Sequence, residues 1–241
     1  MPPIGAHRGE GRDDRRVLRG GERGAMIPAR NRKELSAAGA IKTSRWPRTS
    51  RRQERIEGVL RRRQPTLTVV LEDVHDPHNA SAVLRSCDAV GVLDVHLVYV
   101  REEPPRSSFG RTTSASASKW IRTHFHDSIE ACYAVLRGQG FRILATAVQP
   151  ESHDLYALDL TAPTAVVFGN ETRGVSAEAI AGADGTVFIP MQGMVESLNI
   201  SVACAVTLYE AMRQRRERGM YDTPQLEPGE LAALREEWLR K

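Results

Sequence analysis

Apolar residues follow two spacings from about residue 65 onward, and these spacings predict strands and helices in alternation. Short β-branched runs such as Thr68–Leu71 predict buried strands, whereas apolar residues three or four positions apart predict helices. This order predicts an α/β fold with a mostly parallel sheet. The predicted strands cover residues 68–71, 95–100, 141–148, 164–168 and 186–189, and the predicted helices cover residues 78–90, 129–136, 176–181, 199–218 and 227–240.

Local signals mark several of the boundaries between these elements. Asn79 or Ser81 is expected to cap the helix over residues 78–90, because short polar side chains accept hydrogen bonds from the first free N–H groups of a helix. Ser197 or Asn199 is expected to do the same for the helix over residues 199–218. Residues 107–118 are rich in Ser, Thr and Gly, which predicts a flexible loop.

Positive charge is concentrated at the N-terminal end. Residues 1–65 carry 18 Lys and Arg against 7 Asp and Glu, a net charge of +11, whereas the rest of the chain carries −7. We interpret residues 1–49 as a basic, disordered extension, because they are rich in Gly, Arg and Pro and lack periodicity. Ile56, Val59 and Leu60 lie at helical spacing between arginines, which predicts a basic, nucleic-acid-binding helix over residues 50–65.

Composition excludes several classes of protein. No stretch approaches the roughly 20 apolar residues that a membrane span needs, and the first fifty residues contain no apolar core of a secretory signal. Three widely spaced cysteines argue against a disulfide framework and fit a reducing cytoplasm, so a cytoplasmic location is expected. Aromatic residues make up only 5%, which argues against RNA binding mainly by base stacking.

Ligands of parallel sheets bind beyond the carboxyl ends of the strands, and three predicted loops lie there. They are the loop after Thr146, the loop 169–174 and the loop 190–199. Gly169 follows a buried strand and would let a ligand approach the backbone closely, and Gly174 would permit a sharp turn. The chain contains neither a G-x-G-x-x-G motif nor a phosphate-binding P-loop motif, which disfavours the usual nucleotide sites.

Five polar residues on these segments are candidates for chemistry, and each of them also fits a purely structural role. Asn79 and Arg85 lie on the helix after the first strand, where a helix cap and a surface arginine are the structural alternatives. Glu171 follows Gly169 in what is, taken alone, an ordinary loop between a strand and a helix. Ser197 and Asn199 begin the longest helix, whose free N–H groups attract anions.

Other kinds of site receive less support from the sequence. His75 and His78 lie beside two aspartates, but no third His or Cys cluster is near them in sequence, so no metal site is expected. His124 and His126 are interpreted as residues of a strand end or loop. Ser197 is not expected to be a hydrolytic nucleophile, because no G-x-S-x-G elbow surrounds it.

Taken together, the segments resemble the three motifs of the SpoU/TrmH family in the SPOUT superfamily of methyltransferases, and the similarity extends from about residue 50 to residue 241. The phrases that carry it are Arg61-Arg62-Arg63-Gln64-Pro65, Val74-His75-Asp76-Pro77-His78-Asn79, Leu84-Arg85-Ser86-Cys87-Asp88-Ala89-Val90-Gly91 and the run from Pro190-Met191 to Ala203.

The resemblance implies a SPOUT-type domain over residues 66–218, with helices on both faces of the sheet and a C-terminal trefoil knot, followed by a helical extension over residues 219–241. It also implies a homodimer that uses S-adenosylmethionine to methylate the 2′-oxygen of a tRNA guanosine, guanosine 18 of the D loop. The alternatives are a 2′-O-methyltransferase for another tRNA nucleotide or for rRNA, and a non-catalytic tRNA-binding scaffold.

The same resemblance assigns roles to individual residues. Arg85 would act on the ribose hydroxyl as a base or as a stabiliser paired with phosphate, and Asn79 would orient it. Glu196 stands where the family commonly has glutamine. The implied catalytic residues are Asn79, Arg85, Glu171, Ser197 and Asn199; the implied cofactor-binding residues are Thr146, Gly169, Ile189 and Leu198; the implied tRNA-binding residues are Arg61, Arg62, Arg63, Lys119, Arg213 and Arg215.

Overall fold

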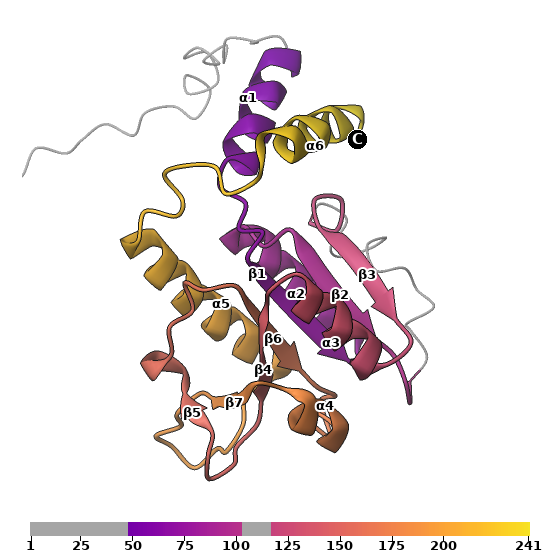
Figure 1. The fold of residues 1–241 in the computed structure, drawn as a ribbon, viewed down its shortest axis with the longest axis vertical. Coiled ribbons are helices and arrows are strands. Elements are labelled where there is room, and N and C mark those ends of the chain that lie inside the picture. The colour runs from indigo at the N-terminus through magenta and orange to yellow at the C-terminus, as the bar shows by residue number, and fades with distance from the viewer. Residues whose placement is uncertain (1–47, 103–116) are drawn as a thin grey trace, which may run out of the picture. The chain divides into compact units, whose positions relative to one another are not determined.

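The computed structural model describes residues 48–102 and 117–241, and both stretches belong to one compact unit of the chain (Figure 1). The expected extension, apart from its last two residues, and most of the expected loop 107–118 lie outside the described residues. The helices are α1 (Arg48–Leu60), α2 (Pro77–Val90), α3 (Ile129–Gly138), α4 (Ala177–Gly182), α5 (Ile200–Glu217) and α6 (Pro228–Arg240). The strands are β1 (Leu67–Glu72), β2 (Asp94–Val98), β3 (Arg122–His126), β4 (Arg142–Thr146), β5 (His153–Asp154), β6 (Thr164–Phe168) and β7 (Gly185–Phe188).

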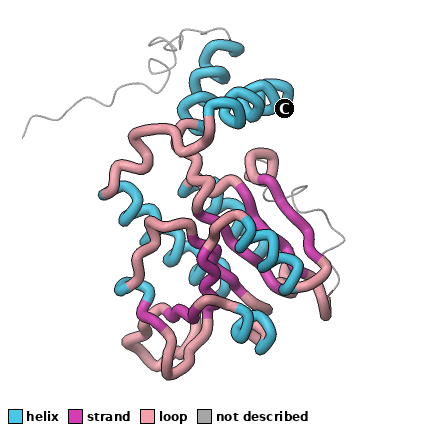
Figure 2. Tube along the Cα trace, viewed as in Figure 1, coloured by secondary structure: helices cyan, strands magenta, loops and turns pink. Residues whose placement is uncertain are grey.

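The strands form one seven-stranded sheet in the order β3-β2-β1-β6-β4-β7-β5. Every pair of neighbouring strands is parallel, which confirms the predicted α/β fold with a parallel sheet. Because all the strands run in the same direction, their carboxyl ends meet at one edge. β6, β4 and β7 are neighbours, so the loops that follow them lie next to one another. Most of the chain around β5 and β7 is loop rather than helix or strand (Figure 2).

Helices cover both faces of the sheet, and the alternation of side chains along β1 assigns each helix to a face. Val69 and Leu71 belong to a buried cluster that includes residues of α2 and α5. Val70, which points to the opposite face, belongs to a second cluster with residues of α3 and α4. The strands are therefore buried on both sides, which explains why they are nearly continuous apolar runs in the sequence.

A third apolar cluster joins the two ends of the described chain. Ile56 and Leu60 on α1 are buried together with Leu234 and Trp238 on α6. These contacts bury the apolar side of the basic helix, as its spacing predicts. No helix among the described residues is long and apolar enough to cross a membrane.

Some local features differ from the sequence-based expectation. β3 and β5 were not predicted as strands, because neither contains an apolar run; β3 forms by pairing with β2 at the edge of the sheet. The cap of α2 is Asp76, whose carboxylate accepts a hydrogen bond from the backbone of His78. The expectation that Asn79 or Ser81 caps this helix is therefore wrong. The expected cap of α5 is confirmed for Asn199.

Candidate active site

Side chains from the three predicted segments meet beyond the carboxyl ends of the strands. Asn79 lies between Glu171 and Asn199. The Asn79 amide donates a hydrogen bond to the Glu171 carboxylate, with Nδ2 and Oε1 3.0 Å apart. Asn199 in turn donates its amide N–H to Asn79, with Nδ2 and Oδ1 3.1 Å apart. One amide thus links the loop after β6 to the N-terminus of α5, although the three residues are far apart in sequence.

The Glu171 carboxylate also binds the loop that follows β1. It accepts hydrogen bonds from the backbone N–H groups of His75 and Asp76, both at 3.2 Å. Partial burial raises the pKa of Glu171, but the bonds from Asn79 and from backbone N–H groups outweigh it, so its pKa lies below the ordinary value. Glu171 is therefore ionised at neutral pH and serves as a fixed acceptor rather than as a proton carrier.

The turn that presents Glu171 has little room for a side chain at Gly169. A Cβ atom placed there would lie 2.1 Å from the carbonyl oxygen of Gly174. The backbones of Asn170 and Gly174 bond each other in both directions, and Gly174 has φ +71°, which glycine adopts readily. The glycine at 169 is thus required by the chain's own backbone, whereas the sequence suggested that it lets a ligand approach. Gly174 permits the sharp turn, as expected.

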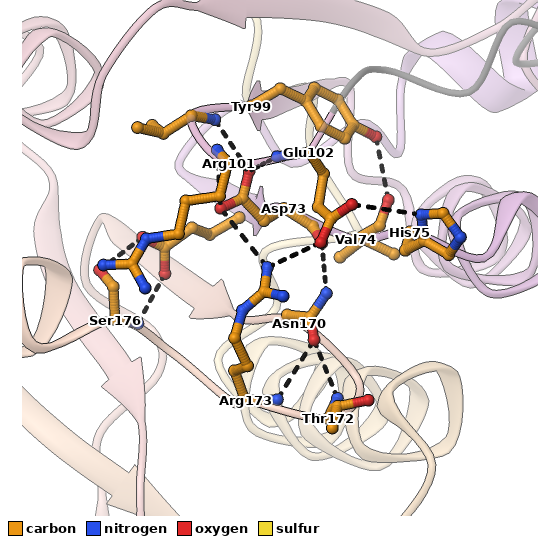
Figure 3. Close-up of polar contacts among 12 residues, drawn as sticks. Asp73, Val74, His75, Tyr99, Arg101, Glu102, Asn170, Thr172, Arg173 and Ser176 are labelled. Atoms are coloured by element: carbon orange, nitrogen blue, oxygen red, sulfur yellow. Dashed lines mark hydrogen bonds and ion pairs between the residues drawn. The ribbon is translucent and has the colours of Figure 1, made fainter.

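A second group of polar contacts fixes the loops after β1 and β6 to each other (Figure 3). The Asn170 side chain donates to the carbonyl of Asp73 at 2.8 Å. The Asp73 carboxylate accepts from the backbone of Val100 at 2.8 Å, and Arg173 forms an ion pair with Glu102 at 2.9 Å. Sequence reasoning did not single out Asp73, Asn170 or Arg173. The available signal was that Asp73 and Asn170 come within two residues of the end of a buried strand.

The expected cofactor-contacting residues come from neighbouring strands. β4 pairs with β7, so Thr146, the last residue of β4, and Ile189, which follows β7, lie on adjacent strands. The Thr146 hydroxyl donates to the Val167 carbonyl at 2.9 Å, and Ile189 and Leu198 are half-buried. From residue 191 to residue 198, no backbone group forms a hydrogen bond with another residue that the structure describes. These N–H and C=O groups are available to a bound molecule.

Arg85 and Ser197 lie apart from the hydrogen-bonded core of the site. Arg85 is exposed on α2, and no hydrogen bond or ion pair joins its guanidinium to another described residue. Within one chain the Asn79 amide bonds Glu171 and Asn199, and no hydrogen bond joins it to Arg85. Ser197 is exposed and has no hydrogen-bond partner within the described part of the chain.

Residues 66–209 match the model of the SpoU rRNA Methylase family. The chain belongs to this family. A protein of Thermus thermophilus named tRNA (guanosine(18)-2'-O)-methyltransferase is 50% identical to it over 194 residues, which cover 80% of this chain and 98% of that protein. The crystal structure of the Aquifex aeolicus TrmH/SpoU tRNA modifying enzyme is 38% identical and covers 79% of this chain and 95% of its own, with a TM-score of 0.73.

A further SpoU methyltransferase, AviRb from Streptomyces viridochromogenes, has been solved in complex with the cofactor AdoMet. It is 28% identical and covers 64% of this chain and 59% of its own, with a TM-score of 0.56.

Among the residues of this SpoU methylase that were expected to bind RNA, four are exposed. Arg61 and Arg62 follow α1, and Lys119 precedes β3. Arg213 on α5 is also exposed, but its guanidinium forms ion pairs with Glu210 at 2.8 Å and Glu217 at 2.7 Å. Surface ion pairs of this kind are weak, so they do not prevent Arg213 from contacting a phosphate.

Arg63 corrects the expectation that all three consecutive arginines bind RNA. Its side chain is completely buried and forms an ion pair with Asp88 at 2.6 Å. It also donates to the Val92 carbonyl at 2.9 Å and lies over the Trp238 ring, 5.0 Å from the ring centroid. Arg63 therefore connects α2 to α6 inside the protein and is not accessible to a phosphate.

Arg215 is a second correction of the same kind. It is completely buried, donates to the carbonyls of Leu160 and Thr66, both at 2.9 Å, and bonds the Gln64 side chain. Burial lowers the pKa of Arg215 to about 10, so the side chain stays charged at neutral pH. Its donors tie α5 to the loops before β1 and β6, and RNA cannot reach them.

Proposed function

We propose that this SpoU methylase transfers a methyl group from S-adenosylmethionine to the ribose 2′-oxygen of a guanosine in tRNA, guanosine 18 of the D loop. The observation that carries the proposal is the pair of hydrogen bonds through Asn79, which joins the three motif segments into one site. The Thermus thermophilus and Aquifex aeolicus relatives, which are named as enzymes that modify tRNA, supply the class of substrate.

The residues after β4, β6 and β7 fit the proposed methyl donor. Ile189 and Leu198 offer half-buried apolar surface to an adenine ring, and the unbonded backbone groups of residues 191–198 suit a ligand held mainly by main-chain contacts. Thr146 and Gly169 would form the floor of the same pocket. When bound, the donor supplies a sulfonium methyl group that is already electrophilic. The AdoMet complex of AviRb supports this choice of cofactor.

Arg85 is the proposed catalytic residue that faces the reacting ribose. A ribose hydroxyl is a poor nucleophile at neutral pH, whereas the guanidinium of arginine stays protonated, with an ordinary pKa above about 12. We therefore assign Arg85 to pairing with the adjacent phosphate and to stabilising the developing alkoxide, while the hydroxyl proton passes to solvent water as the methyl group is transferred. Glu171, Asn79 and Asn199 would hold the surrounding loops in position, and Ser197 would contact the bound ligands.

The position of Arg85 favours a site shared by two subunits. Six residues of helix separate it from Asn79, which corresponds to about 9 Å along the axis. Val202 and Tyr209, seven residues apart on α5, are 46% and 50% exposed, and Met194 is fully exposed. Apolar residues at this spacing lie on one side of a helix and suit a contact between copies. We propose a homodimer in which Arg85 completes the partner's site. In this proposal the loops that surround each site belong to the trefoil knot.

The tRNA phosphates would contact the exposed bases, namely Arg61, Arg62, Lys119 and Arg213. We place this reaction in the cytoplasm, where tRNA is available. No metal is needed for any step of the proposed transfer.

Methyl transfer from a labelled donor to an unmodified tRNA transcript, followed by mapping of the labelled nucleotide, tests the proposed function. We expect label at guanosine 18 alone. A transcript with 2′-deoxyguanosine at that position is the matched control, because it lacks only the accepting oxygen, and it should remain unlabelled. Label at another nucleotide, or in rRNA alone, would favour the alternative substrates. Tight tRNA binding without transfer would favour a non-catalytic scaffold.

A further inference from the structure

Two histidines and a cysteine gather on the side of the sheet that α3 covers, and the proposed methyl transfer uses none of them. His96 lies on β2, His126 on β3 and Cys132 on α3. One ligand atom from each residue lies within 4.8 Å of the other two. His96 Nδ1 and His126 Nε2 are 2.9 Å apart.

The strand register and the packing of α3 bring the three side chains together. β2 and β3 are parallel, with His96 beside His124 and Val98 beside His126, so His96 and His126 point to the same face. Val98, on that face, belongs to the same buried cluster as Cys132. Figure 1 shows α3 beside the part of the sheet that contains β2 and β3. His96 and Cys132 are buried, and His126 is partly exposed.

We propose that His96, His126 and Cys132 form a binding site for a zinc ion, with His96 Nδ1, His126 Nε2 and Cys132 Sγ as protein ligands. Two imidazole nitrogens and one thiolate are ligands that bind zinc in preference to magnesium or calcium, which favour oxygen ligands. The fourth, tetrahedral position would hold water, since the partly exposed His126 leaves this side open to solvent. This proposal is independent of the proposed methyl transfer.

The two imidazole nitrogens already lie close to the separation that a shared zinc ion requires. Zinc–nitrogen bonds of about 2.0–2.1 Å at a tetrahedral angle separate two ligand nitrogens by about 3.3 Å. The two imidazole nitrogens, now 2.9 Å apart, would have to separate by a few tenths of an ångström. The imidazole that donates their hydrogen bond would move its proton to its other ring nitrogen. The Cys132 thiol would release one proton to solvent, since only the thiolate binds the metal.

Zinc at this position would hold the edge of the sheet together. β3 is one of the two edge strands, and all of its side chains are at least partly exposed, so few apolar contacts hold it. A metal ion bonded to β2, β3 and α3 would connect three elements through ligands that are 30 and 6 residues apart in sequence. Binding only to the folded chain would add the binding free energy to its stability.

Zinc uptake by the full-length, untagged chain, freed of metal by dialysis against a chelator, tests the site directly. Calorimetric titration with zinc should give one ion per chain. Cobalt(II) as a spectroscopic probe should produce a thiolate-to-metal charge-transfer band. In Cys132→Ala the band should disappear and zinc affinity should fall at least about tenfold. Cys204→Ala is the matched control, because it removes another buried cysteine on the opposite side of the sheet and should retain both properties.

A second variant and a stability measurement keep the test decisive if Cys132→Ala folds poorly. His126→Gln changes a partly exposed ligand and should weaken zinc binding by a similar factor. Added zinc should raise the melting temperature of the wild type and of Cys204→Ala, but not that of His126→Gln. The proposal is overturned if the wild-type chain takes up no zinc, or if Cys132→Ala and His126→Gln bind it as tightly as the wild type.

Discussion

Single side chains in this protein act mainly by joining loops that are distant in sequence. Asn79 is suited to the centre of the site because an amide carries both a donor and an acceptor, so it can bond a carboxylate on one side and another amide on the other. Arg63 and Arg215 do comparable work inside the protein, where a guanidinium supplies several donors to carbonyl groups. At this scale, burial decides whether a charged residue serves the fold or a ligand.

Replacing Arg63 with alanine should destabilise the protein strongly. The change leaves the Val92 carbonyl without its donor and removes the cation beside the partly exposed Asp88, so we expect a loss of more than about 2 kcal/mol. Equilibrium urea unfolding measures the loss. Arg61→Ala, two residues away and exposed, is the control and should change the free energy of unfolding by less than about 0.5 kcal/mol. Equal effects of the two variants would contradict a structural role for Arg63.

The ionised Glu171 should make stability depend on pH in the acidic range. Hydrogen bonds hold its pKa below the ordinary value in the folded protein, so its contribution is complete above the unfolded pKa of about 4.3. The contribution is lost as the pH falls through the lower, folded value. We expect the free energy of unfolding to fall more steeply below about pH 5 in the wild type than in Glu171→Gln. If the free energy of unfolding of the two proteins changed with pH in the same way, the hydrogen bonds of Glu171 would not contribute to stability.

At the scale of secondary-structure elements, the parallel sheet places the loops after β1, β4, β6 and β7 at one edge. The tight turn after β6 determines where Glu171 points, and its position depends on the missing side chain at Gly169. The loop before α5 contrasts with this turn, because its backbone groups between residues 191 and 198 bond no other described residue. One loop is thus held rigidly by the protein, and the other is free to bind a ligand.

Gly169→Ala should disrupt the site through the backbone. The added methyl group would collide with the Gly174 carbonyl, so the turn must open and carry Glu171 away from Asn79. We expect a loss of more than about 2 kcal/mol in the free energy of unfolding and a large fall in kcat. Unfolding and methyl-transfer kinetics measure the two effects. In Gly193→Ala, where an added Cβ meets nothing within 4 Å, stability should be nearly unchanged.

At the scale of the whole molecule, the proposed dimer would complete two surfaces of the single chain. Arg85 has no partner among the described residues, and the exposed apolar side of α5 is uncovered. A symmetric dimer would use the same α5 surface on both subunits. The exposed bases after α1 lie outside the sheet domain and would extend the surface that contacts tRNA.

Mixed dimers test whether Arg85 acts across the subunit interface. Arg85→Ala and Glu171→Ala should each be inactive, with binding of S-adenosylmethionine largely retained in Arg85→Ala. After subunits of the two variants are mixed by co-expression, half of the dimers contain one intact site, so about a quarter of wild-type activity should return. Size-exclusion chromatography with light scattering checks the dimer. No recovery from a verified mixed dimer would mean that Arg85 serves its own subunit.

Salt dependence tests the proposed tRNA contacts. A protein that neutralises several phosphates loses affinity steeply as salt rises, with roughly one unit of logarithmic slope for each contact. Replacing Arg61 and Arg62 together with glutamine should reduce the slope by about 1.5. Filter binding across a salt series provides the measurement. Glu57→Gln, which changes an exposed acid near the end of α1, should leave the slope unchanged or slightly steeper.

The sequence predicted some secondary-structure elements and some residue roles better than others. β1, α2, β6 and α5 follow from apolar periodicity, and the three site segments follow from polar residues at strand ends. β3 contains only one large apolar side chain, so its sequence carried no strand signal, and pairing with β2 decided its conformation. Residues 61, 62 and 63 are all arginine, so the sequence gives no sign of which one is buried. In the structure only Arg63 points into the protein.

The amino-acid sequence by itself determined the order of strands and helices, the parallel sheet and the three segments that carry the site. These features arise from side-chain spacing and turn chemistry, which act between residues that are close along the chain. Only the tertiary structure decided that Asn79 bonds Glu171 and Asn199, that Arg63 and Arg215 are buried, and that His96, His126 and Cys132 meet. Each of those outcomes depends on how distant segments pack, because burial and hydrogen-bond partners are properties of neighbours in space.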